Sequence, residues 1–405
     1  MTDVPIEAGA GDDAADLEEI YGRRSPEHGV VQEPAKTAFQ PWHHPRKQYV
    51  RINQWCAAAQ ALIGDLGLGP NDPFRYLTLP GNELLDVRAL HGVCQRAGLR
   101  LRYLGFNSVG QNTPAQAELA LSQSEVRALS HVDGFSHVME DRLEAIANER
   151  SPVFVRARQD GPFHAINIDL CDSIAFREIG HRRGSPLGAV AKLLELQTQS
   201  AAPWLLFITT LAKPALVAAP ARDGFMRAVG DNAAASAEFR RELASLVETT
   251  ADQLDHRLAE AWNGQDPAFL RLFCTGLGKW LLMLLGAAAP PRELVLLSSC
   301  YYQVGPDGPD MLSLAFRCNT TPQPLVDRFD ILPPAPAAPP FSEAEAAIRM
   351  AGRIGETFDL DGKLAADAVL RERLIAQAGR LLATARYEAA AYEAWARGLL
   401  AQPVA

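Results

Sequence analysis

The amino-acid sequence predicts an α/β protein with a mostly parallel sheet. Strand-like and helix-like segments alternate over residues 74–210, an order that is typical of parallel sheets covered by helices. Two further apolar runs, 294–302 and 311–316, flank a turn sequence of Gly, Pro and Asp and predict an antiparallel β-hairpin. The chain has 405 residues, enough for one large core with extensions.

Composition excludes several classes of protein. Hydrophobic residues make up 48% of the chain and charged residues 21%, and the net charge is -9. An acidic surface of this kind does not favour sequence-independent binding of nucleic acid over the whole molecule. The six cysteines lie far apart without a C-x-x-C pair, so neither a zinc ribbon nor a dense disulfide framework is indicated. His-based metal motifs and Walker A are also missing from the sequence.

The N-terminal part predicts a tail followed by a helix. Residues 1–40 contain many Gly, Asp, Glu and Pro residues and few large apolar ones, which predicts a disordered acidic tail. Because this tail has no apolar core, it is not a signal peptide, and we expect a cytoplasmic protein. Apolar residues spaced by three and four between Ile52 and Ile63 then predict a helix with one buried face.

The main α/β domain is predicted over residues 41–330. Its first strand is expected at 74–79, a helix at about 84–97, and a second strand at 99–107. Residues 115–148 are predicted to be mostly helical, with a break at 131–134 that could contain a short strand. Residues 152–158 and 164–170 are both predicted as strands, either paired as a hairpin or parallel. A helix after residue 186 and a strand at 203–210 complete the alternation.

Two helical regions are added to this domain. Residues 223–286 predict a helical insertion, whose apolar part at 269–285 is interrupted by Arg271 and Lys279, which favours a buried helix over a membrane span. Residues 331–341 are Pro-rich and predict a stiff linker. The helical C-terminal extension at 342–405 begins with a capping box of Ser342 and Glu345. Its long second helix, 363–399, must pack either on the core or on a partner chain.

The most informative stretch is 163–172. Ile166 and Ile168 follow a Gly-Pro breaker and predict a short buried strand, which ends in the two carboxylates Asp169 and Asp172. In open α/β sheets, ligands bind at the carboxyl ends of the strands. Asp169 and Asp172 are therefore candidate catalytic residues. The alternative is that Asp172 caps the next segment while Asp169 bonds local backbone amides.

This order of elements resembles the class I S-adenosylmethionine-dependent methyltransferases, with their Rossmann-like sheet that ends in a hairpin whose last strand is inserted antiparallel. The resemblance covers residues 46–318 and implies S-adenosylmethionine as cofactor. It implies a cofactor loop after the first strand, a ribose contact after the second, and a methyl-transfer pocket after the fourth. The single glycine of the loop, the Asn in place of an acidic residue, and the missing Asx-Pro-Pro-aromatic motif depart from the family pattern. The cofactor-binding residues implied are Pro80, Gly81, Asn82, Glu83, Asn107, Leu170 and Cys171.

A basic segment precedes the first helix. Arg46, Lys47 and Arg51, together with the aromatic Trp55, could hold a phosphate backbone and stack a base, so nucleic acid is a candidate partner of the segment 43–51. The alternative is an N-terminal helix that covers the sheet or the mouth of the cofactor site, with its charges in solvent.

Two hypotheses for function follow. The first is a bacterial methyltransferase acting on an unknown acceptor, with nucleic acid as one candidate. The second is a catalytically inactive Rossmann-like subunit of a larger assembly, such as a bacterial defence or nucleic-acid-processing complex, which would bind another protein chain through the helical C-terminal extension. Neither hypothesis places the protein in a membrane.

Overall fold

The computed structural model describes residues 35–70, 72–110, 112–176, 184–306, 308–320 and 341–400. The chain divides into two compact units, 1–36 and 37–405. All helices and strands that the structure describes belong to the second unit. Residues 1–34 of the predicted disordered tail and the Pro-rich linker up to residue 340 lie outside the described residues. The end of the predicted tail is corrected, because Phe39 packs against the rings of Tyr387 and Trp395.

A single eight-stranded sheet forms the centre of this unit, with strand order β3-β2-β1-β4-β5-β7-β6-β8. All neighbouring strands are parallel except β7, which is antiparallel to both β5 and β6. The predicted α/β class and the hairpin formed by β6 and β7 are thus confirmed. The strands are β1 (Pro73–Thr78), β2 (Arg100–Phe106), β3 (His137–Met139), β4 (Ala165–Asp169), β5 (Trp204–Leu211), β6 (Arg292–Tyr302), β7 (Met311–Thr320) and β8 (Phe358–Asp359).

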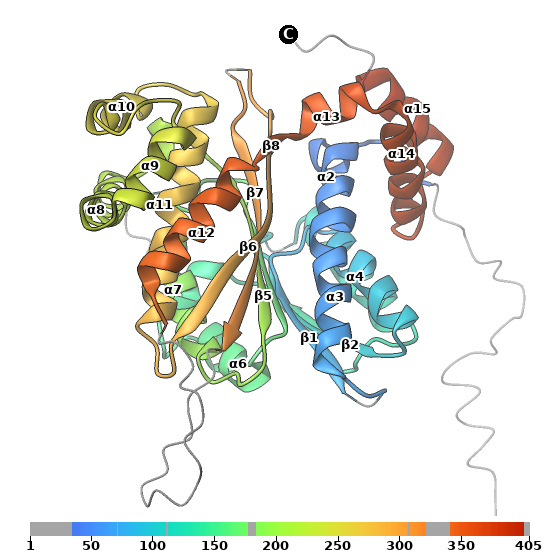
Figure 1. Ribbon diagram of the computed structural model, residues 1–405. Helices are drawn as coiled ribbons and strands as arrows, with labels where there is room; N and C mark the ends of the chain where they lie inside the picture. The colour runs from blue at the N-terminus through green and yellow to red at the C-terminus, as the bar shows by residue number, and fades with distance from the viewer. Residues whose placement is uncertain are drawn as a thin grey trace, which may run out of the picture. The chain divides into compact units, whose positions relative to one another are not determined.

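Helices cover both faces of the sheet (Figure 1). On one face a continuous helix made of α2 (Pro45–Tyr49), a π-helical segment (Val50–Cys56) and α3 (Ala57–Leu66) packs beside α4 (Leu85–Arg96) and α5 (Pro114–Arg127). The other face carries α6 (Pro152–Asp160), α7 (Pro186–Gln197), α8 (Ala219–Ala235), α9 (Ala237–Leu246), α10 (Leu254–Ala261), α11 (Pro267–Gly286) and α12 (Glu343–Gly355).

Strand β4 shows why the sheet forms from this sequence. Successive side chains of a strand point to opposite faces, and Ile166 and Ile168 accordingly join the core under α6 to α11, whereas Ala165 joins the core under α3 and α4. Both faces are buried, so the strand is almost entirely apolar. Within the strand Asn167 is polar and fully buried, and Asp169 is polar where the strand ends. A polar group at such a position requires partners inside the protein.

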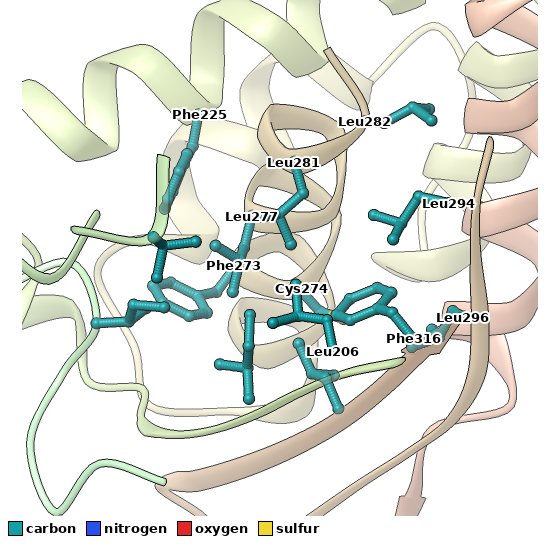
Figure 2. Packing of buried hydrophobic residues seen from close by; sticks show 14 of the residues in the cluster. Leu206, Phe225, Phe273, Cys274, Leu277, Leu281, Leu282, Leu294, Leu296 and Phe316 are labelled. Carbon is teal, nitrogen blue, oxygen red and sulfur yellow. The ribbon is translucent and has the colours of Figure 1, made fainter. Parts of the chain in front are cut away.

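The predicted helical insertion is confirmed as α8 to α11. Helix α11 packs against α8, α12 and β6, and Figure 2 shows its Phe273, Leu277 and Leu281 among the residues of the surrounding core. Among the described residues, α11 is the one helix long and apolar enough to cross a membrane, and 78% of its apolar window is buried inside the protein. This burial agrees with its interpretation as a core helix.

The structure corrects three predicted elements. Residues 152–158, predicted as a strand, belong to helix α6, because Ser151 caps its first turn, Pro152 occupies the first position, and Val153, Phe154 and Ala157 share one buried face. The break at 131–134 forms only an isolated bridge, and the strand β3 lies further on. The predicted long helix at 363–399 is three helices, α13 (Leu360–Ala366), α14 (Ala368–Ala383) and α15 (Ala389–Leu400).

The C-terminal helices pack on the body of the same chain. Helix α14 contacts α2 and α4, and Leu85 of α4 is buried in a cluster with Leu382, Tyr387 and Tyr392. Arg386 forms ion pairs with Glu118 and Glu125 of α5. The described part of the extension therefore packs on the core, which was one of the two alternatives. Binding of a partner chain stays a prediction. Ser342 accepts a hydrogen bond from the Glu345 amide and so caps α12, which is the N-cap half of the predicted capping box.

Candidate functional site

A cavity of about 270 Å³ lies at the carboxyl ends of three neighbouring strands. Its walls come from the loop after β1, from Asn107 after β2, and from Asp169 and Cys171 at the end of β4. Strand β1 lies between β2 and β4, so the cavity opens where the strand order reverses direction. In open α/β sheets this reversal leaves a crevice in which ligands bind. The expected site residues Pro80, Gly81, Asn82, Glu83 and Asn107 all line it.

The loop after β1 is fixed by hydrogen bonds within the protein. The side-chain amide of Asn107 donates to the Pro80 carbonyl oxygen at 2.8 Å and to Asn82 Oδ1 at 3.2 Å, and its oxygen accepts from the Val109 amide. A side chain at Gly105 would lie 3.0 Å from Pro80 Cγ, so a glycine is required where the loop crosses β2. Asn107 thus positions the loop, whereas the resemblance implied a contact with a ribose.

Glu83 connects this loop to the C-terminal extension. The hydroxyl of Tyr387 donates to Glu83 Oε1 at 3.0 Å, and the Glu83 carbonyl accepts from Arg88 Nε at 2.9 Å. Glu83 is only 7% exposed, and burial with the neighbouring Glu83 carboxylate raises the pKa of Tyr387. The loop expected to hold the cofactor is therefore held in place by a residue that lies 304 positions away in the sequence.

A buried polar network lies under the first cavity. Asp86 Oδ2 accepts hydrogen bonds from the Tyr76 hydroxyl at 3.0 Å and the Thr78 hydroxyl at 2.5 Å, and the Asn167 amide donates to the Tyr76 oxygen at 2.9 Å. Burial raises the pKa of Asp86, which lines the cavity. Sequence reasoning missed this group. Its signals were the polar Asn167 inside an apolar strand and two hydroxyl side chains on the same face of β1.

The N-terminal helix supplies two cations. Lys47 Nζ lies 2.5 Å from Asp169 Oδ1 and 5.0 Å from the centre of the Trp55 ring. Arg51 donates to the Trp42 carbonyl at 3.2 Å, and its buried Nε has no hydrogen-bond partner in the part of the chain that the structure describes. Burial lowers the pKa of Arg51. Arg51 and Trp55 belong to the π-helical segment Val50–Cys56, a rare conformation that is frequent at functional sites.

The expected basic surface patch is not exposed. Lys47 is 8% exposed, Arg51 6% and Trp55 3%, because this helix lies over the end of the sheet with these side chains directed inward. Arg46 pairs with Asp361 at 2.9 Å and also contacts the Gln303 carbonyl oxygen. A nucleic acid bound through these residues would have to enter the cavity. The N-terminal helix thus covers the site, as the alternative to nucleic-acid binding predicted. Its Lys47 and Arg51 side chains, however, are buried and do not lie in solvent.

A second cavity of about 560 Å³ adjoins the first. Both are lined by Trp42, Lys47, Asp169 and Cys171, so the ion pair between Lys47 and Asp169 lies where they meet. The second cavity is also lined by Leu170 and by residues of the N-terminal segment, the β6–β7 hairpin and helix α15. These are Phe39, Pro41, His44, Arg46, Tyr302, Val304, Met311, Trp395 and Leu399.

The two candidate carboxylates differ in their surroundings. Asp169 lines both cavities. Asp172 is exposed, lines neither cavity, and accepts a hydrogen bond from the Ser173 amide at 2.7 Å. Asp172 thus has the local capping role given as its alternative. Cys171 stands between them, and desolvation together with the Asp169 carboxylate raises the pKa of its thiol.

The described residues contain no group of three or more His, Cys, Asp or Glu side chains that could hold a metal ion. Comparisons with known proteins return no match among curated proteins and no match among solved structures. A family model described as PP_RS20740-like matches residues 36–397, nearly the whole chain, and the protein therefore belongs to the PP_RS20740-like family.

Proposed function

We propose that the protein is an S-adenosylmethionine-dependent methyltransferase that binds its cofactor in the first cavity and the methyl acceptor in the second. The observation that carries the proposal is the meeting of the two cavities at Asp169, at the carboxyl end of β4. Transfer between two bound molecules requires adjacent sites that hold the reacting atoms in line. This arrangement provides two such sites with a carboxylate at their boundary.

The order of the strands supports the same proposal. Strand β7 is inserted antiparallel between β5 and β6, which is the feature of class I methyltransferases on which the resemblance rests. The first cavity lies at the reversal of strand order, at the ends of β1, β2 and β4. Since a shared fold alone is weak support for a shared function, the residues of the site must fit the cofactor as well.

The polar groups around the first cavity fit the amino-acid end of the cofactor. Arg51, whose buried Nε lacks a hydrogen-bond partner within the described ranges, is suited to a carboxylate. Asp86 has one oxygen occupied by two hydroxyl groups and is suited to an ammonium group. A side chain at Gly81 would have its nearest neighbour at 3.7 Å, so this glycine leaves the cavity open on the side of the loop.

S-adenosylmethionine supplies an electrophilic methyl group when it is bound. The residues of this chain orient the acceptor and take its proton, if the acceptor has one to lose. Asp169 is placed for that step, because its Oδ1 is held by Lys47 while the carboxylate faces both cavities. Lys47 fixes the orientation of the carboxylate.

Titration calorimetry with S-adenosylmethionine and with S-adenosylhomocysteine tests the proposal. We expect saturable binding of both with a Kd below about 1 mM. Gly81→Leu should abolish it by filling the cavity, whereas Gly64→Leu, at a helix position with no atom within 4 Å, should not. No heat of binding at millimolar cofactor would overturn the proposal. That outcome would favour the alternative of a catalytically inactive subunit.

A further inference from the structure

We propose that the second cavity binds a flat, uncharged aromatic molecule with one hydroxyl or amine group, and that this group lies against Asp169 and Tyr302. The binding step is independent of the proposed function, whereas the assignment of this molecule as the methyl acceptor rests on it.

The walls of the cavity are mainly aromatic and aliphatic. Trp42, Tyr302 and Trp395 come from three separate parts of the chain and line one cavity. Aromatic walls favour ring-shaped ligands, because stacked and edge-to-face contacts add to the burial of apolar area. Trp42 is 45% exposed and Val304 53% exposed. Large apolar side chains that are exposed at the mouth of a cavity are typical of a binding site.

The charges around the cavity are already neutralised by protein partners. Arg46 pairs with Asp361 at 2.9 Å and lies 5.5 Å from the centre of the Tyr302 ring. Lys47 pairs with Asp169. Burial and the adjacent Arg46 lower the pKa of His44 to about 3, so this ring is neutral at pH 7. Because the two basic side chains described in its lining, Arg46 and Lys47, already have carboxylate partners, phosphorylated and carboxylated molecules are disfavoured.

Two polar groups remain to orient the ligand. Tyr302 is only 4% exposed, lines the cavity, and forms no hydrogen bond through its hydroxyl with any part of the chain that the structure describes. Asp169 uses Oδ1 for Lys47, and no protein group in the described ranges bonds its Oδ2. The Tyr302 hydroxyl and Asp169 Oδ2 are therefore available to a ligand in this cavity. A single hydroxyl or amine on the ligand can donate to Asp169 and accept from Tyr302.

The transfer step balances with these groups. The acceptor loses its O–H or N–H proton to the Asp169 carboxylate, and its oxygen or nitrogen forms a new bond to the methyl carbon. The bond from that carbon to the sulfonium sulfur breaks, and the sulfur keeps the electron pair as a thioether. No oxidant or metal is needed.

The binding step is tested with 2-naphthol, a fluorescent neutral probe with two rings and one hydroxyl, using the full chain without cofactor. We expect saturable binding, and weaker binding of 2-naphthoate by about tenfold or more because its carboxylate has no free cation to pair with. Val304→Glu, at an exposed position in the β6–β7 turn, should weaken 2-naphthol binding by about tenfold without affecting folding. Tyr302→Phe should weaken it by about threefold to tenfold.

Trp280→Ala, in a separate apolar groove lined by α8 and α11, serves as the control and should leave 2-naphthol binding unchanged. Equal affinity for 2-naphthol and 2-naphthoate, or no effect of Val304→Glu, would overturn the inference. If 2-naphthol binds as expected but S-adenosylmethionine does not bind, the proposed function fails while the ligand class stands. If both bind, formation of 2-methoxynaphthalene identifies the ligand class as the acceptor class, and its absence refutes that assignment.

Discussion

Lys47 and Asp169 form an ion pair of 2.5 Å that joins the N-terminal helix to the end of strand β4. The two residues are 122 positions apart in the sequence. Their side chains are 10% and 23% exposed, so the pair is mostly removed from solvent. This pair separates the two cavities and sets the position of the carboxylate that both of them share.

Breaking this pair should destabilise the protein more than breaking a surface pair. Asp169→Asn leaves the buried Lys47 without a counter-charge, and we expect the free energy of unfolding to fall by about 1–2 kcal/mol. A double-mutant cycle with Lys47→Met, measured by urea denaturation, should give a coupling of about 1 kcal/mol. The control is Arg317 with Asp65, whose side chains are 25% and 53% exposed, and which should couple by less than about 0.5 kcal/mol. Equal couplings would contradict the burial argument.

Asp86 allows a test that separates its charge from its hydrogen bonds. Burial raises the pKa of this carboxylate, so its charged form is costly in the folded state at pH 7. Asp86→Asn keeps an oxygen for the Tyr76 and Thr78 hydroxyls, and we expect stability to stay within about 1 kcal/mol of the parent. Asp86→Ala leaves both hydroxyls without an acceptor and should lose about 2–3 kcal/mol.

Cofactor binding by the same two variants checks the role given to Asp86. If its carboxylate holds an ammonium group, then both variants should bind S-adenosylmethionine about tenfold or more weakly, although only Asp86→Ala is unstable. Calorimetry on Asp86→Asn, which stays folded, decides the point. Unchanged affinity in that variant would confine Asp86 to a structural role.

The buried His44 should make the protein sensitive to acid. Its pKa is lowered to about 3 in the folded state, by burial and by Arg46, against about 6.5 when unfolded. Between these two values the unfolded chain binds the extra proton and the folded chain does not. Stability is therefore present above pH 6.5 and is lost as the pH falls, by about 2 kcal/mol from this one residue between pH 7 and pH 5.

His44→Asn should remove that loss, because Asn cannot titrate and can still accept the helix-capping hydrogen bond from the Arg46 amide. The comparison is the difference in unfolding free energy between pH 7 and pH 5 for the parent and the variant, by urea denaturation at each pH. An identical acid dependence in both proteins would show that the pKa of His44 is the same in the folded and unfolded states, and would contradict the burial argument.

How far the sequence alone predicts this site depends on which contacts are local. Strand β4 and the position of Asp169 follow from the apolar pattern of a few residues, and the hairpin follows from its turn sequence. Lys47 and Glu83 acquire their roles from partners 122 and 304 positions away, which no local pattern encodes. Residues 152–158 differ, because here local signals conflict: the β-branched valines favour a strand, whereas Ser151 and Pro152 start a helix. Burial of the basic segment also depends on the packing of the C-terminal helices.

The contact between Tyr387 and Glu83 predicts that the C-terminal extension supports the cofactor loop. Tyr387→Phe removes a buried hydrogen bond of 3.0 Å and should lower the free energy of unfolding by about 1 kcal/mol. Because Glu83 then loses its partner beside the first cavity, we expect S-adenosylmethionine to bind about threefold to tenfold more weakly. Tyr49→Phe, at the exposed contact with Lys363, is the matched control. A chain that ends at residue 341 and binds the cofactor normally would contradict this coupling.

Two glycines within helices, Gly276 of α11 and Gly352 of α12, allow a matched test of how closely α11 packs against its neighbours. A methyl group at Gly276 would lie 2.6 Å from Phe225 Cβ, close to the backbone of α8, whereas at Gly352 of α12 no atom lies within 4 Å. Replacement of a helical Gly by Ala stabilises a helix by about 1 kcal/mol where space allows. Gly352→Ala should therefore raise the free energy of unfolding by up to about 1 kcal/mol. Gly276→Ala should lower it by about 1–3 kcal/mol, because α8 and α11 must separate. Thermal and urea denaturation of both variants measure the difference, and a stabilised Gly276→Ala protein would refute the close approach of α8 to α11.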